Sequence, residues 1–335
     1  MIHTIEMILS IDYETIKRLL KKHNVQSDAY HHFGAVVKKL NENLKQSHSE
    51  FVFTWLCSQG KGVWDAHLKV DLVKLLGKGK IVEADYLTVE SSIKKFLYSQ
   101  FGSTEYFNNH RLTRIDYKLD VVIPNKDHRK LLFHLYEKYT RIYFYKKKIK
   151  WGKDEEGNPM KYETSQYHKC QSTEFVIYSK EDERMAKREI VQPYEKDVIR
   201  YELRLKNEHL NSMKRNDSKG KGRPKKLKEY FKENLYKHYM INQITPIIRK
   251  GDYYKIHQAE KIIENSPLSR KRKEKLRAFL VDISNNGIDA PKKYLSKPTY
   301  RNYLKELEQL NINPILIPKN RKDFPSHMNN PFIIQ

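Results

Sequence analysis

Apolar and polar residues alternate with the period of a β-strand in three segments of the chain, 114–123, 174–180 and 198–206. Each segment would therefore have one apolar face, which can pack against helices, and one charged face. The charged faces would consist of Arg114, Asp116, Lys118 and Asp120, then Glu174, Tyr178 and Lys180, and finally Arg200, Glu202, Arg204 and Lys206. Because strands with one apolar face are typical of antiparallel sheets, the pattern predicts a central antiparallel sheet with helices on one face.

The rest of residues 1–212 mixes shorter strands and helices. Alternation predicts strands, and a spacing of three to four residues predicts helices. A turn-rich loop is expected where glycines and a proline gather, at 152–159. The expected strands are 3–11, 50–57 and 141–151, and the expected helices are 13–23, 84–101, 127–140 and 181–191. Residues 1–212 are therefore predicted to form an α+β domain.

The composition changes after Leu210. Residues 213–228 are strongly basic and contain glycine and proline, so they are predicted to be a linker or a phosphate-binding loop. Residues 229–335 are predicted to be mainly helical. A helix over 268–287 would end at Gly287, a short second helix would follow, and a third over 296–312 would start at Ser296 as N-cap. A short wing strand is expected at 313–318, and together these elements have the outline of a winged helix-turn-helix domain. A plain helical cap on the first domain is the alternative.

The charge of the chain points to a polyanionic partner. Lys+Arg number 65 against 41 Asp+Glu, a formal net charge of +24 that is spread over the whole chain. Nucleic acid is the first candidate, although a ribosomal or a membrane-surface protein would share this charge. The two cysteines exclude a disulfide framework, and no run is apolar enough for a membrane span. We therefore expect a soluble, cytoplasmic protein.

Two Arg-x-acid pairs, Arg114-x-Asp116 and Arg200-x-Glu202, would put two carboxylates on one face of the sheet. Paired carboxylates can hold Mg²⁺ or Mn²⁺, and such a cation can polarise a phosphodiester. The alternative is a sheet face that is simply solvated. The sequence contains no P-loop, so no nucleotide hydrolase signature competes with this hypothesis.

Tyr178 is the candidate nucleophile. A tyrosine has a pKa near 10, so its phenolate costs roughly 4 kcal/mol at pH 7 and needs cations beside it. Lys180, two residues further along the same expected strand, is one such cation. Tyr167 and Tyr194 are alternatives, whereas Tyr201 alternates with apolar residues and is expected in the core.

The ordered segments "RIDYKLDV", "TEFVIYSKEDE" and "VIRYELRLKNEHL" resemble those of filamentous-phage replication initiators and, more distantly, of rolling-circle plasmid initiators and conjugative relaxases. The resemblance implies a relaxase-type domain that nicks one strand of origin DNA, giving a 5′-phosphotyrosine and a free 3′-OH. It implies that Tyr178, Lys180 and Arg200 are catalytic and that Asp116 and Glu202 bind the metal. The His-x-His pair of many such enzymes is absent, so Glu183 or His168 would complete the ligands, unless they are ordinary surface residues.

The implied partners are double-stranded origin DNA, single-stranded DNA, and a helicase and polymerase of a bacterial host cell. Two rival functions remain open, a DNA-binding regulator without catalysis and an RNA-binding protein that uses the sheet as a stacking platform. Such a platform needs exposed aromatic residues on the charged face, and Tyr117 and Tyr201 belong to the apolar set. The expected phosphate contacts are Lys146, Lys147, Lys148, Lys150, Lys219, Lys221, Arg223, Lys225 and Lys226, and the expected major-groove contacts are Lys297, Thr299, Arg301, Asn302 and Lys305.

Overall fold

A computed structural model describes residues 1–26, 33–139, 146–148, 151–153, 159–161, 163–218 and 220–334. The chain divides into two compact units, which are described separately below. The first unit comprises Met1–Lys118, Gln171–Glu174 and Glu202–His238, and the second comprises Leu119–Cys170, Phe175–Tyr201 and Tyr239–Gln335. The division into 1–212, 213–228 and 229–335 that the sequence suggests stays a prediction.

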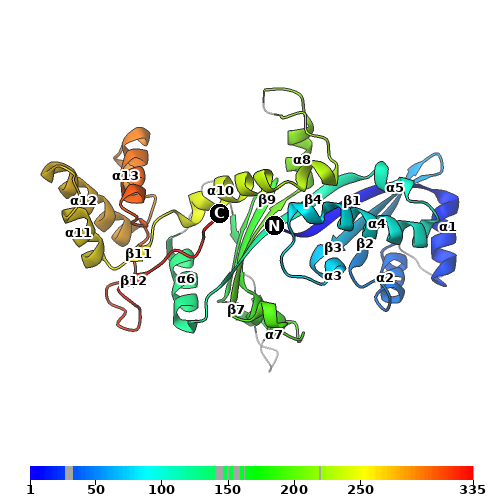
Figure 1. Cartoon of the computed structure of the whole chain (residues 1–335), viewed down its shortest axis with the longest axis horizontal. Coiled ribbons are helices and arrows are strands. Elements are labelled where there is room, and N and C mark those ends of the chain that lie inside the picture. The colour runs from blue at the N-terminus through cyan, green and yellow to red at the C-terminus, as the bar shows by residue number, and fades with distance from the viewer. Residues whose placement is uncertain are drawn as a thin grey trace. The chain divides into compact units, whose positions relative to one another are not determined.

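The fold is α+β, as predicted, and is built on a mainly antiparallel sheet (Figure 1). Its hydrogen-bonded strand order is β2-β3-β1-β4-β10-β9-β8-β5. The strands are β1 (Ile2–Asp12), β2 (Phe51–Gly60), β3 (Val63–Asp71), β4 (Arg111–Val122), β5 (Lys146–Lys148), β8 (Ser165–Lys169), β9 (Thr173–Ser179) and β10 (Val198–Leu205). Two small antiparallel pairs lie outside this sheet, β6 (Trp151–Lys153) with β7 (Pro159–Lys161) and β11 (Tyr253–Tyr254) with β12 (His327–Met328).

The core of the first unit lies between the apolar face of β1, β2 and β3 and a set of helices. Ile5, Met7 and Leu9 alternate along β1 and are fully buried. Phe51 of β2 stacks on Phe96, with ring centroids 3.8 Å apart. The helices and helical turns of this unit are α1 (Tyr13–Lys22), α2 (Phe33–Leu44), α3 (Leu72–Leu76), η2 (Glu83–Asp85), α4 (Tyr86–Phe101), α5 (Glu105–Asn108), α8 (Asn207–Lys214) and α9 (Leu227–Tyr230).

Four register shifts interrupt the strands of the first unit, one of them at the exposed end of β2 next to Gln59, and the other three are β-bulges that are flanked by buried residues. The register shows one extra residue at each bulge, His3 in β1, Thr113 in β4 and Thr54 in β2. A bulge shifts the alternation by one residue, so apolar residues three apart face the same side. These buried flanking pairs are Ile2 and Ile5, Leu112 and Ile115, and Phe53 and Leu56. The bulges thus add polar residues to the other side, which we call the polar face and which carries Thr4, Glu6, His67 and Asp116.

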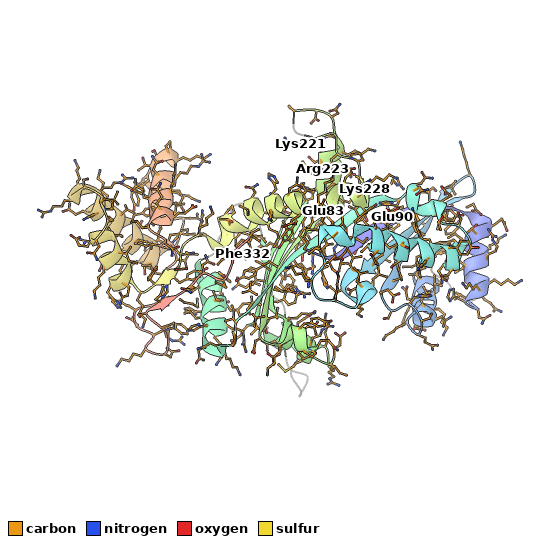
Figure 2. All side chains as sticks on the ribbon, in the orientation of Figure 1. Glu83, Glu90, Lys221, Arg223, Lys228 and Phe332 are labelled. Carbon is orange, nitrogen blue, oxygen red and sulfur yellow. The ribbon has the colours of Figure 1, made fainter. Side chains whose placement is uncertain are left out.

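In the second unit, α6 (Lys126–Tyr139) packs against β10 through a chain of buried tyrosines. The Tyr136 and Tyr201 hydroxyls are 3.0 Å apart, and the Tyr253 hydroxyl lies 3.4 Å from that of Tyr136. Tyr201 is fully buried, in agreement with its expected place in the core. Phe332, labelled in Figure 2, contacts Tyr201 edge to face at 5.1 Å.

The C-terminal helices of the second unit follow the sequence prediction closely. They enclose a core that includes Leu276, Phe279 and Tyr303. Ser296 caps the last helix, because its hydroxyl accepts a hydrogen bond from the Thr299 amide. The elements are α11 (Ile256–Glu264), α12 (Arg270–Asn286), the 3₁₀ turn η4 (Ala290–Lys293) and α13 (Lys297–Gln309), and they follow α10 (Glu233–Ile248).

Some expected elements differ from the structure. Segment 313–318 forms no wing strand, because only Ile312 and Ile317 make bridges there, to Asp252 and Lys255. Several elements were not predicted from the sequence, among them α2, β3 and β8. In the part of the chain that the structure describes, no helix combines the length and the apolar character that a membrane crossing requires.

Candidate active site

Three side chains that could hold a metal ion lie close together on the polar face of the first unit. One ligand atom each of His3, Asp116 and Glu202 lies within 4.8 Å of the other two. Asp116 comes from β4 and Glu202 from β10, as the alternation predicted, and each is only 1% exposed. The structure therefore places both predicted carboxylates in one group, which we call the acidic group, and adds His3 to them.

His3 was not predicted to be a candidate ligand, although the sequence of β1 carries a signal for it. The residue is the extra one in the first β-bulge, which turns it toward Asp116 and Glu202. Two non-apolar residues, His3 and Thr4, stand in succession between the inward-facing Ile2 and Ile5. This break in a period of two is what a bulge looks like in a sequence.

Two arginines hold the carboxylates of the acidic group. Arg114 binds Asp116 with both ends of its guanidinium, at 2.7 and 2.5 Å, and reaches Glu6 at 2.8 Å. Arg204 binds Glu202 at 2.7 Å and Glu174 at 3.3 Å. In this network four carboxylates share two guanidinium groups, so the network itself has an excess of two negative charges.

The two carboxylates of the acidic group suit a hard divalent cation. Carboxylate oxygens are ligands that Mg²⁺ and Mn²⁺ prefer, whereas the imidazole nitrogen of His3 is a donor more typical of softer ions, and ligand atoms on opposite sides of Mg²⁺ lie about 4.2 Å apart. The spread of at most 4.8 Å in the acidic group needs only a small contraction to match this. A divalent charge would also balance the network of ion pairs.

The raised pKa of Asp116 also favours a cation at the acidic group. Burial raises the pKa of Asp116 above its ordinary value, and the charge of Glu202 adds to this effect, although Arg114 opposes it. A carboxylate that is costly to ionise gains from a cation beside it, because the cation favours the charged form.

A pocket of about 370 Å³ adjoins the acidic group. Arg114, Arg204 and Glu174, which take part in the ion-pair network, line it. Its other lining residues come from β1, β3, β4 and the start of α8 and are Glu6, Ile8, His67, Thr113, Lys206, Asn207 and Glu208.

Tyr178 lies near the end of β9 in the second unit, next to Arg200. The Arg200 Nη1 donates to the Tyr178 hydroxyl at 3.5 Å, and the guanidinium carbon lies 6.0 Å from the centre of the ring. Asp120 of β4 holds the same guanidinium at 2.6 and 2.9 Å. Arg200 is 2% exposed, so the candidate nucleophile and its nearest cation are set in the interior rather than on a solvated face.

Lys180 does not share a strand with Tyr178, which corrects the sequence analysis. The strand ends at Ser179, whose hydroxyl accepts from the Asp182 amide and caps α7 (Lys180–Ala186). The ammonium of Lys180 nevertheless lies 6.0 Å from the Tyr178 ring. Burial and the charge of Arg200 lower the pKa of Lys180, and the ion pair with Glu183 opposes this shift. A carboxylate oxygen of Glu195 lies 3.6 Å from the same ammonium.

The remaining candidates lie apart from these contacts. Glu183 pairs with Lys180 and Lys187 in the first turns of α7, and no contact of Glu183 with the acidic group is recorded among the described residues. His168 of β8 is buried, not on the surface, and its ring stacks on Phe175 at 6.0 Å. Tyr194 is exposed.

Comparisons with known proteins give matches among solved structures alone. No protein-family model matches the sequence, and no curated protein matches it. One of the matching structures is that of a rolling circle replication initiator protein from Geobacillus stearothermophilus. It is 11% identical, with a TM-score of 0.29, and covers 94% of this chain and 98% of that chain. At this TM-score the match carries no argument about function.

The basic segment at 213–228 is an anchored loop that follows α8. The amides of Lys221 and Arg223 donate to the carbonyl of Met213, and Figure 2 labels both residues on this loop. Lys221 is exposed, and Arg223 lies over the Tyr230 ring at 5.4 Å. Lys225 and Lys226 have internal partners instead, the side chains of Asn207 and Asn211 for the first and the carbonyls of Asn108 and His110 for the second.

The other expected DNA contacts are only partly described. Lys150 and Lys219 lie outside the described residues. Lys146, Lys147 and Lys148 form β5, whose side chains are not described either. In α13 the side chains of Lys297, Arg301, Asn302 and Lys305 are exposed and Thr299 is half-buried. These residues stay predictions.

Proposed function

We propose that this protein initiates rolling-circle DNA replication by nicking one strand of origin DNA in a metal-dependent transesterification. The phenolate oxygen of Tyr178 attacks phosphorus and forms a 5′-phosphotyrosine, while the bond to the 3′ oxygen breaks and a free 3′-OH leaves with a proton. One phosphoester replaces another, so the step needs no nucleotide hydrolysis. The free 3′-OH is the primer for a polymerase.

The observation that carries the proposal is the acidic group. A histidine and two carboxylates that are 1% exposed lie within 4.8 Å, in a network with excess negative charge. Such a group is unexpected for a solvated sheet face, which was the ordinary explanation of the alternating charges. When bound there, Mg²⁺ or Mn²⁺ would polarise a phosphodiester and offset the charge of its transition state.

The surroundings of Tyr178 support its role as the nucleophile. The phenolate costs roughly 4 kcal/mol at pH 7, and one hydrogen bond from a charged donor returns about 1.5–3 kcal/mol. Arg200 is placed to give that bond, although at 3.5 Å it has to shorten when a phosphate arrives. Lys180 is a second cation near the ring. The reaction further requires that Tyr178 and the acidic group act on the same phosphodiester, which the following experiment addresses.

The test uses a pool of labelled single-stranded oligonucleotides of randomised sequence with Mn²⁺ or Mg²⁺. We expect a protein–DNA adduct that survives denaturing electrophoresis, and we expect mass spectrometry to locate it on Tyr178. Tyr178→Phe should form none, because the phenol is the attacking group. Asp116→Asn should lower the yield by at least about 100-fold, since even supporting residues of metal sites contribute about 10- to 100-fold.

Tyr194→Phe is the matched control, because Tyr194 is an exposed tyrosine of the same unit and should leave the adduct unchanged. A full yield of adduct from Tyr178→Phe would refute Tyr178 as the nucleophile. Equal yield in EDTA would refute the metal dependence.

A further inference from the structure

A row of side chains crosses the polar face of the first unit from its edge strand inward. Trp55 of β2 is the register partner of His67 in β3, His67 is the partner of Ile8 in β1, and Ile8 is the partner of Arg111 in β4. Partners in register point to the same face of a sheet. The bulge at Thr54 is what turns Trp55 to this face, because regular alternation from the buried Phe53 would turn it inward.

The two ends of the row are accessible to solvent. Trp55 is 52% exposed, which is unusual for the largest aromatic side chain, and the side chain of Arg111 is 53% exposed. Asp65 holds the Arg111 guanidinium at 2.7 Å, so this cation is fixed in place. Burial lowers the pKa of His67, and the charge of Arg111 lowers it further. The charges of Asp65 and Glu6 oppose this shift. A neutral imidazole presents a flat ring rather than a charge.

The row continues into the pocket beside the acidic group. His67 and Ile8 line this pocket together with Arg114, Arg204 and Lys206. From β2 to β4 the row crosses three strand intervals, or about 14 Å. It therefore leads, within one unit, from an exposed aromatic ring to Arg114 and Arg204, the arginines that hold the two carboxylates of the acidic group.

We propose that this row, Trp55, His67 and Arg111, is a platform on which an unpaired DNA strand stacks its bases on the way to the acidic group. The inference rests on the proposed function and names the form of its substrate. Stacking on aromatic rings with cations for the phosphates is the general way in which proteins bind single strands without reading their sequence. The bases of a duplex are already stacked on one another, so the platform selects unpaired DNA.

Cations lie along the row for the phosphates of this occupant. They are Lys69, Arg111 and Lys206, and they stand among the acids Glu6, Asp65 and Glu208 of the same face, on a chain with a net charge of +24. A polyanion with flat bases matches both the cations and the exposed indole, whereas an apolar protein surface would match only the indole. The rival function of RNA binding on the sheet becomes an outcome of the test below.

The test measures binding without chemistry. Fluorescence anisotropy follows labelled oligo(dT) and oligo(rU) on the full chain carrying Tyr178→Phe, in EDTA. Trp55→Ala should weaken oligo(dT) binding roughly 5- to 150-fold, the range expected for one lost stacking contact, and Trp55→Phe should restore most of it. Arg111→Gln should make the slope of log K against log salt shallower by about 0.7.

Tyr98→Ala is the matched control, since Tyr98 is an aromatic residue of the same unit that is 64% exposed but lies on α4. The platform is refuted if Trp55→Ala binds oligo(dT) like its parent, or if Tyr98→Ala loses as much. Tighter binding of oligo(rU) than of oligo(dT) refutes DNA as the occupant. Because no metal or adduct is involved, loss of binding in Trp55→Ala would stand even if Tyr178 proved not to form an adduct.

Discussion

Buried charges with specific partners distinguish the polar face from an ordinary sheet surface. Asp116, Arg200 and Glu202 are at most 2% exposed, and Arg114, Asp120 and Arg204 hold them. Removing one partner of such a pair leaves a charge without compensation and typically costs 3–5 kcal/mol. Substitutions here therefore lower stability, and their effects on the proposed reaction have to be measured on protein shown to be folded.

Glu183 gives a prediction that depends on pH. Burial alone would raise its pKa, but the hydrogen bonds and charges of Lys180 and Lys187 outweigh this and lower the pKa of Glu183 to about 2. A lowered pKa stabilises the fold above the ordinary value of 4.5, and the effect is lost as the pH falls toward 2. Glu183→Gln should therefore cost up to about 3 kcal/mol at pH 7 and progressively less below pH 4.5.

Thermal unfolding at pH 7 and pH 3 measures this difference. The control is Glu181→Gln, because Glu181 is an acid in the same helical turn that accepts a long hydrogen bond, of 3.5 Å, from the Asp197 amide. This substitution should lower the stability less than Glu183→Gln does. A loss for Glu183→Gln that is as large at pH 3 as at pH 7 would contradict the ion-pair account.

At the scale of residues, the sequence predicted some neighbours of the candidate site but not all of them. Alternation placed Asp116 and Glu202 on one face, where they lie together, whereas the catalytic roles of Tyr178 and Arg200 stay predictions. Asp120, which holds Arg200, was placed on the right face but given no role. Such partners come from neighbouring strands, and the order of strands in a sheet is not encoded in the pattern of any one of them.

At the scale of elements, the ends of strands and helices were predictable from the sequence where a residue next to the end, such as a capping residue, determines it. Ser296 and Gly287 delimit their helices as expected, because a hydroxyl cap and a flexible glycine act locally. The end of β9 was predicted one residue too late, because Lys180 continued the polar alternation of the strand. The N-cap at Ser179 instead makes Lys180 the first residue of α7. The bulges were missed because a strict period of two was applied across each strand.

Gly251 gives a prediction for the connection between α10 and β11. Its φ is +85°, and a Cβ there would stand 2.5 Å from the carbonyl carbon of Ile312 and 2.7 Å from the amide nitrogen of Asn313. Gly251→Ala should therefore destabilise the second unit by more than the roughly 1–3 kcal/mol of backbone strain alone.

The melting temperature measures this effect, at about 2–4 °C per kcal/mol. Gly34→Ala in α2 is the control, because a Cβ at Gly34 meets nothing within 4 Å and alanine favours a helix. An unchanged melting temperature for Gly251→Ala would show that the segment near Ile312 can move aside.

At the scale of the whole molecule, the charge of +24 predicts how DNA affinity depends on salt. If about eight cations contact phosphates, log K for duplex DNA should fall with log salt at a slope of roughly −7. Lys221→Gln should make this slope shallower by about one, because Lys221 is exposed on the basic loop. Lys39→Gln on α2 is the control, and an equal change for both variants would show that general charge rather than the loop is responsible.

The three bulges have a consequence for how this sheet could have arisen. Without His3, Thr54 or Thr113, the alternation would be regular at that point of the strand, with the apolar residues on both sides still facing the helices. Each bulge is thus equivalent to a single-codon insertion into a regular strand. Deleting one of these residues changes what the sheet presents to a substrate while sparing its core. In this protein the core residues and the candidate site residues lie on the same strands. A single inserted residue can therefore change the polar face of a strand while its apolar face stays in the core.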